Sequence, residues 1–195
     1  MSERNTVMRG LHDVGLAAWF GGSLMGAVGL NGAAKEQGTS RHEGARIASA
    51  GWALWTPVGA LAIGTHLVGS CGLLKANAGR VFTQQGVAAS SLAKTVLTGA
   101  ALAATVYGRA LGKRIELASF EQPDTEKNED HLTDTGQAER HLSYIQWVVP
   151  TLTGGLIILN ALQGEQQRPT QQLHAIWKRA RTLAPYVVTS RHWPH

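Results

Sequence analysis

The chain has little charge and almost no cysteine. Charged residues make up 16% of its 195 residues, against roughly 25% in ordinary soluble domains. The single cysteine, Cys71, has no partner for an intramolecular disulfide and cannot build a thiolate metal site. The sequence also contains no HExxH, CxxC, GxSxG or P-loop motif. The common signatures of zinc, redox, esterase and nucleotide-binding sites are therefore missing.

The positive charge that is present does not indicate a nucleic-acid partner. The formal net charge is +5 and the pI is near 9.7. The basic residues are spread along the chain and form no stripe interleaved with aromatic residues, which nucleic-acid binding needs. The mean hydropathy of −0.09 is an average over apolar blocks and long polar connectors. It therefore hides the pattern that predicts the fold.

Long apolar windows dominate the sequence. Residues 14–34, 47–74 and 142–164 contain no Asp, Glu, Lys or Arg, and one further window, 87–107, the third along the chain, contains only Lys94. A helix needs about 20 mainly apolar residues to cross a bilayer. All four windows are long enough, and the third, 87–107, is the weakest because of its lysine.

These windows predict an all-α fold, a four-helix transmembrane bundle over residues 1–164 with a tail over 165–195. The alternative is a soluble bundle of buried helices rich in glycine and alanine. Amphipathic surface helices of a soluble bundle should show charges on every turn of the wet face, and these windows do not. The first window is longer than the apolar part of a signal peptide, so we expect it to be retained as a span.

Small residues recur in the windows at a four-residue spacing. This spacing lets helix backbones approach closely in lipid. Two rows show it: Ala18, Gly22 and Gly26 in the first window, and Ala100, Ala104, Gly108 and Gly112 in and after the third. We expect Gly22, Gly26, Ala104 and Gly108 to lie at helix contacts.

The connectors and the tail suggest an orientation. Lys and Arg are divided almost evenly between the two sides, but residues 109–140 turn acidic, and 109–120 can extend the third helix. Residues 170–184 have helical spacing of apolar residues beside basic ones, which is typical of a helix on an anionic membrane surface. Folding against the chain's own bundle is the alternative. The predicted surface residues are Trp177, Lys178, Arg179 and Arg181. We expect a multi-pass plasma-membrane protein with both termini cytoplasmic.

Alternating helix direction predicts one polar layer inside the membrane. His12 and Asp13 lie at the start of the first span, and Asn160 lies near the end of the last. His66 would lie roughly 12 Å, and Lys94 roughly 10 Å, from the same side. Such a layer suits a proton relay, an anion or headgroup site, or a cofactor site. Haem bound by His12 and His66 is a further option, without any attachment motif to support it.

The same residues also allow a purely structural interpretation. Lys94 can extend its stem to the interface, and Asp13 can stabilise the N-terminal end of its helix. A neutral buried His66 with one hydrogen-bond partner is ordinary in a helix bundle. Both interpretations stay open at this point.

The N-terminal segment resembles a group of small actinobacterial membrane proteins of uncharacterised function. The similarity lies in Leu11-His12-Asp13 and in Trp19-Phe20-Gly21-Gly22-Ser23-Leu24, with looser similarity in residues 46–52 and 86–94. The resemblance implies no activity. A more distant similarity is to the His-then-Trp-x-Gly-Gly start of copper-resistance-type membrane domains, but this chain lacks their Met- and His-rich ligands.

Three functions fit these observations. The chain is predicted to be a non-catalytic membrane subunit or scaffold that packs with itself or with a larger complex, with the lipid bilayer and no nucleic acid as partners. The alternative is a small oligomeric transporter or channel component that uses the Asp13, His66 and Lys94 layer. A redox or lipid-modifying enzyme with His12 and His66 as ligands is the third.

Overall fold

The computed structural model describes residues 5–79, 85–120 and 136–163. Within these ranges almost every residue is helical and no strand occurs. The chain divides into two compact units, Met1–Ile157 and Ile158–His195, and every contact below lies inside the first. The predicted tail, with Trp177, Lys178, Arg179 and Arg181, lies outside the described residues.

Four helices in the described ranges are long and apolar enough to cross a membrane. The first is a continuous helix of 32 residues, in which a short π-helical stretch, η1, separates α1 from α2. The elements are α1 (Thr6–Met25), η1 (Gly26–Leu30), α2 (Asn31–Gln37), α3 (Arg41–Ala76), α5 (Gln85–Phe120) and a last helix, Gly136–Gln163. The prediction of four apolar helices is therefore confirmed.

The helices extend beyond the predicted windows at nearly every end. The third window is the clearest case, because α5 is as long as α3, at 36 residues each. Lys94 does not interrupt it, and α5 continues to Phe120 as the sequence predicts. One lysine is compatible with an unbroken helix because lysine has a good helix propensity.

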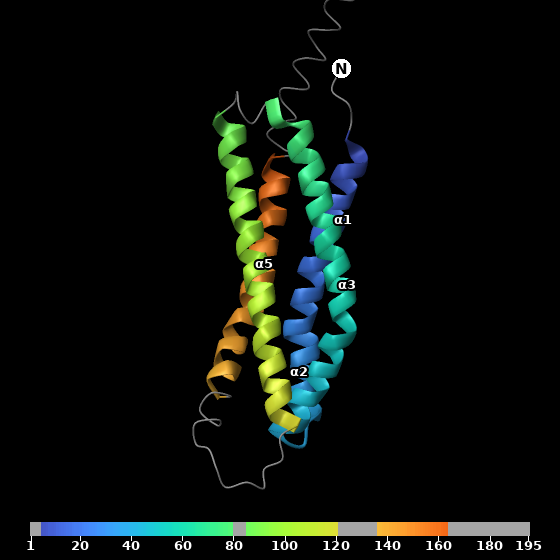
Figure 1. Cartoon of the computed structure of the whole chain (residues 1–195), viewed down its shortest axis with the longest axis vertical. Helices are drawn as coiled ribbons and strands as arrows, with labels where there is room; N and C mark the ends of the chain where they lie inside the picture. Colours follow the sequence, from blue (N-terminus) through green and yellow to red (C-terminus); the bar gives the residue numbers. More distant parts are fainter. Residues whose placement is uncertain (1–4, 80–84, 121–135, 164–195) are drawn as a thin grey trace, which may run out of the picture. The chain divides into compact units, whose positions relative to one another are not determined.

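The first helix and α3 form an antiparallel hairpin, shown side by side in Figure 1. At the start of α3, the Ser40 side chain accepts a hydrogen bond of 3.2 Å from the Glu43 backbone N–H. The Glu43 carboxylate in turn accepts from the Thr39 backbone N–H at 2.9 Å and from the Thr39 hydroxyl. This arrangement resembles a capping box and satisfies N–H groups that have no partner within the helix. The Thr39 bonds also hold the pKa of the Glu43 carboxyl below its usual value.

The apolar core joins the hairpin to the other two helices. Trp19 of α1 is 3% exposed and packs with Ala101 and Ala104 of α5 and with Val149 of the last helix. A second cluster joins Leu111 and Ile115 to Ala138. Polar contacts add to this packing: the Ser49 hydroxyl of α3 and the Lys113 ammonium both donate to the Glu116 carboxylate, and Lys113 does so at 2.8 Å.

The outer faces of the helices are apolar. Exposure is 68% for Val14 on α1, 80% for Leu54 on α3, 69% for Val106 on α5 and 75% for Tyr144 on the last helix. Soluble monomers rarely expose apolar patches that extend over several elements. This surface suits lipid or a protein partner.

Candidate functional site

The predicted polar layer is partly assembled where α1 crosses α3. His12 lies on α1 and is 8% exposed, and its Nδ1 lies 2.8 Å from the Asp13 carboxylate. The Asp13 side chain itself is 56% exposed. Since a carboxylate oxygen accepts hydrogen bonds, Nδ1 of His12 carries the proton and donates it.

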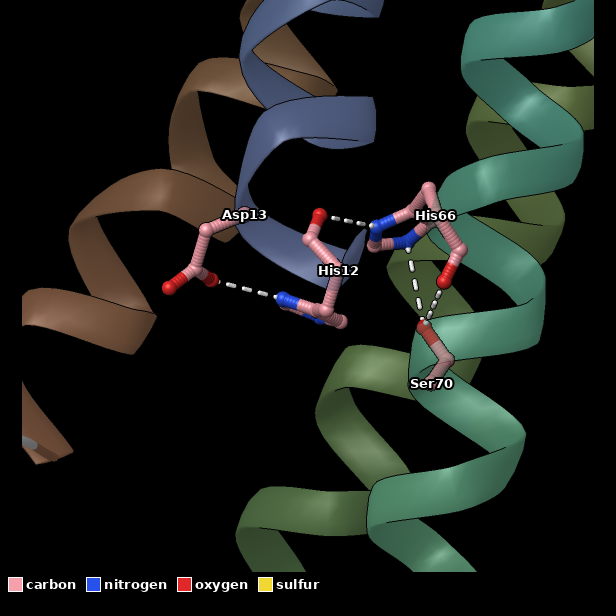
Figure 2. A network of polar contacts seen from close by, with 4 residues as sticks. All are labelled: His12, Asp13, His66 and Ser70. Atoms are coloured by element: carbon pink, nitrogen blue, oxygen red, sulfur yellow. Dashed lines mark hydrogen bonds and ion pairs between the residues drawn. The ribbon is translucent and has the colours of Figure 1, made fainter. Parts of the chain in front are cut away.

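His66 faces His12 from α3 and is 1% exposed. Its Nδ1 lies 3.2 Å from the His12 backbone carbonyl, so it too acts as a donor there. The Ser70 hydroxyl donates to the His66 backbone carbonyl at 2.8 Å, and its oxygen lies 3.5 Å from Nε2 of His66. Figure 2 shows these contacts as a chain that leads from Asp13 through His12 to His66 and Ser70.

The two imidazole rings are in contact. Their centroids lie 4.5 Å apart and the ring planes are tilted by 47°. The indole of Trp19 lies on the core side, with its centroid 6.1 Å from that of His66. The pair therefore has Asp13 on its exposed side and the aromatic core on the other.

Each histidine sits opposite a glycine of the other helix. A Cβ added to Gly15 would lie 2.6 Å from the Ala62 carbonyl oxygen and would clash with the His66 backbone. A Cβ added to Gly69 would lie 2.7 Å from Cα of His12. Such distances are not tolerated between atoms of neighbouring backbones, so both positions require glycine. The close approach of the two backbones places the imidazoles against each other.

The sequence carries a signal for this crossing, a four-residue pattern that occurs once on each of the two helices. The pattern His-x-Val-Gly occurs as His12-Asp13-Val14-Gly15 and again as His66-Leu67-Val68-Gly69. In an antiparallel pair, this repeat places His12 opposite Gly69 and Gly15 opposite His66. Ser70 follows the second copy directly, and sequence reasoning missed its role.

The other two predicted members of the layer are Lys94 and Asn160. Lys94 on α5 is half-buried, and the charges of Asp13 and Arg9 act on it. Its direct pairing with Asp13 stays a prediction. Asn160 belongs to the second unit, so its place in the layer also stays a prediction.

The histidine pair does not fit a haem. An iron held by both imidazoles would stand between the rings, about 2 Å from a nitrogen of each. With centroids 4.5 Å apart and both Nδ1 atoms hydrogen-bonded, the rings leave no space for it. Within the described residues, no group of three or more His, Cys, Asp or Glu side chains could hold a metal ion.

A second polar contact crosses the bundle at the π-helical stretch. Asn31, at the start of α2, accepts a hydrogen bond of 2.9 Å from the Trp52 indole and donates one of 2.8 Å to Gln146 of the last helix. Gln146 is itself anchored, since its amide donates to the Ser143 carbonyl at 3.0 Å. Asn31 thereby links three helices. Its isolated position in an apolar window is the sequence signal for such a role.

The predicted packing residues occupy two kinds of contact. Gly22 and Gly26 face the indole rings of Trp55 and Trp52 on α3. Ala104 is 6% exposed in the core, and Gly108 faces Ile145 of the last helix, where an added Cβ would lie 3.4 Å from a side-chain carbon. The contacts at Gly22 and Gly26 are therefore much tighter than the contact at Gly108.

Comparisons with protein families, with curated protein sequences and with solved structures find no match to this chain. The resemblance to actinobacterial membrane proteins therefore stays a prediction. The function has to be argued from the helices and the polar contacts of the chain itself.

Proposed function

We propose that the chain is a non-catalytic integral membrane subunit, a four-span scaffold that packs with copies of itself or within a larger membrane complex. The observation that carries the proposal is the apolar outer surface of all four helices, which includes Leu54 at 80% exposure and Val106 at 69%. Hydrocarbon or a protein partner must cover such a surface. We propose the plasma membrane as its location, with both termini on the cytoplasmic side.

The exposed face of α5 supports a packing role. Its exposed positions include a set of small residues at helical spacing, namely Ala93, Gly99, Ala100, Ala103 and Ala110, beside the larger Leu92, Val96 and Val106. In lipid, such a face lets a second helix come close, and van der Waals packing between the helices then stabilises the contact.

Membrane insertion is tested by fractionating cells that express the full chain. The expected result is retention in the membrane pellet after alkaline carbonate extraction and release by mild detergent alone. Recovery of the folded chain in the aqueous fraction without detergent would overturn the proposal.

Association is tested by purifying a tagged chain, in mild detergent, from cells that also make an untagged copy. We expect the untagged copy or a distinct membrane protein to co-purify in fixed ratio. Ala103→Leu on α5 should reduce that ratio, because the bulky side chain keeps a second helix at a distance. Ala60→Leu, at an exposed position of α3, is the matched control and should leave it unchanged. A lone monomer, or equal loss in both variants, would contradict the packing role.

A further inference from the structure

The crossing of α1 and α3 combines features that a structural contact alone does not need. The imidazole rings of His12 and His66 are buried, with their centroids 4.5 Å apart. The Asp13 carboxylate, which is hydrogen-bonded to His12, lies on the exposed side. Ionisable groups at such depth are costly and usually functional. We propose that the His12–His66 pair is a binding site for a single proton, with Asp13 as its counter-charge. This goes beyond the scaffold function and does not depend on it.

The hydrogen bonds fix where the proton can bind. Both Nδ1 atoms donate in the neutral pair, His12 to Asp13 and His66 to the His12 carbonyl. The Nε2 lone pairs are therefore the positions left for an added proton. On His66, a new Nε2–H would point to the Ser70 oxygen, whose own hydrogen is already directed to the His66 carbonyl. One N–H bond forms and no other bond has to break.

The pair is built for one proton rather than two. Two imidazolium charges with ring centroids 4.5 Å apart repel each other strongly in a low-dielectric interior. The first proton is compensated by the Asp13 carboxylate, which lies 2.8 Å from His12. Uptake of a first proton therefore disfavours uptake of a second by the same pair.

The charges around the pair come from two helices. Asp13 and Arg9 lie on α1, and Lys94 lies on α5, where the charges of both act on it. From α3, His66 itself and the Ser70 hydroxyl face the pair. The stretch of the last helix from 142 to 157 contributes no ionisable side chain except Tyr144. The charge of Asp13 thus acts on Lys94 as well as on the two histidines.

Imidazole ¹⁵N NMR tests the site in the full chain in lipid nanodiscs, with His12→Gln used to assign the signals. At high pH we expect both histidines as the Nδ1–H tautomer. As the pH falls, the pair should take up one proton well before the second. Two independent steps at the same pH, or no uptake before the protein unfolds, would overturn the proposal.

Two variants with opposite expected effects sharpen the test. Asp13→Asn removes the counter-charge and should lower the proton affinity of the pair about ten-fold or more. Lys94→Met removes the competing cation and should raise that affinity. Circular dichroism checks that both variants stay helical. Equal affinities in the wild type and Asp13→Asn would refute the role of Asp13. The wild-type titration decides the proposal even if a variant fails to fold.

Discussion

The α1–α3 hairpin and α5 are both rich in small residues, but their glycines lie in different surroundings. In the hairpin, Gly15 and Gly69 meet the backbone of the facing helix, closer than any Cβ could approach. On α5, a Cβ at Gly99 or Gly112 would meet nothing within 4 Å. Glycine is therefore required by packing at these two positions of the hairpin and is left uncovered at these two positions of α5.

This difference shows what the spacing of small residues can and cannot predict. The row that contains Gly22 and Gly26 lies along the hairpin contact, where tryptophan rings cover both glycines. The row on α5 turns from the buried Ala104 to the open Gly112. Four-residue spacing identifies a face of small residues, but the facing helix decides whether that face is already occupied.

The largest expected effect comes from filling the closest contact of the hairpin. Gly69→Ala places a methyl group against the His12 backbone, and we expect it to destabilise the protein by about 1–3 kcal/mol. The matched control is Gly64→Ala on the same helix, where a Cβ meets nothing within 4 Å. Thermal unfolding in detergent, followed by circular dichroism, compares the two. Equal melting temperatures of the two variants would show that the backbone contact at Gly69 does not require glycine.

Removal of the polar link at the π-helical stretch should have the next largest effect. Asn31→Ala leaves the Trp52 indole and the Gln146 carbonyl without their cross-helix partner, and the expected cost is about 0.6–1.7 kcal/mol. Ser23→Ala is the control, because Ser23 donates only to the Phe20 carbonyl of its own helix. Thermal unfolding of both variants checks the expectation. If Asn31→Ala lowers the melting temperature no more than Ser23→Ala does, the hydrogen bonds of Asn31 add nothing to the stability of the hairpin.

The turn that closes the hairpin should matter less than the contact along it. Ser40→Ala removes the N-cap of α3, and we expect it to lower the stability by about 1 kcal/mol. Faster amide hydrogen exchange at the start of α3, measured at fixed pH, would show this loss.

The pKa of Glu43 is lowered in the fold by its hydrogen bonds from Thr39. Its contribution is therefore complete above the ordinary carboxyl range and is lost as the pH falls through the lowered value. Protection factors, which are corrected for the base-catalysed rise of intrinsic exchange, should therefore fall at acidic pH, and factors that fall towards neutral pH instead would contradict this sign.

The smallest expected effect has the opposite sign. Gly99→Ala on α5 adds a methyl group in open space, and by reducing the freedom of the unfolded chain it should stabilise the protein by about 0.4–1 kcal/mol. The melting temperature should rise slightly. A fall in the melting temperature instead would show that a partner helix already covers Gly99 in the detergent sample. Gly99 would then be a packed glycine, like Gly15 and Gly69 of the hairpin.

The sequence predicts the helices far better than the contacts between them. Long windows with at most one charged residue identify all four apolar helices, because hydrocarbon disfavours charge over the length of a span. The meeting of His12 with His66 follows in outline from alternating helix direction. The apolar windows do not predict the roles of Gly15, Gly69 and Ser70, because helix length does not fix the rotation or register of two packed helices. The repeated His-x-Val-Gly pattern is the signal that points to the two glycines.

The most direct test of the account is a cysteine cross-link across the hairpin, formed in native membranes. A Cβ at Gly72 would lie 3.3 Å from that of Met8, close to the roughly 3.5–4.5 Å that a disulfide requires. In a Cys71→Ser background, Met8→Cys with Gly72→Cys should form an intramolecular disulfide on mild oxidation, seen as a gel shift that a reductant reverses. Gly10→Cys with Gly72→Cys should not, because Gly10 has no neighbour within 4 Å. No cross-link in the first pair, or equal cross-linking in both, would contradict the close antiparallel packing of α1 and α3.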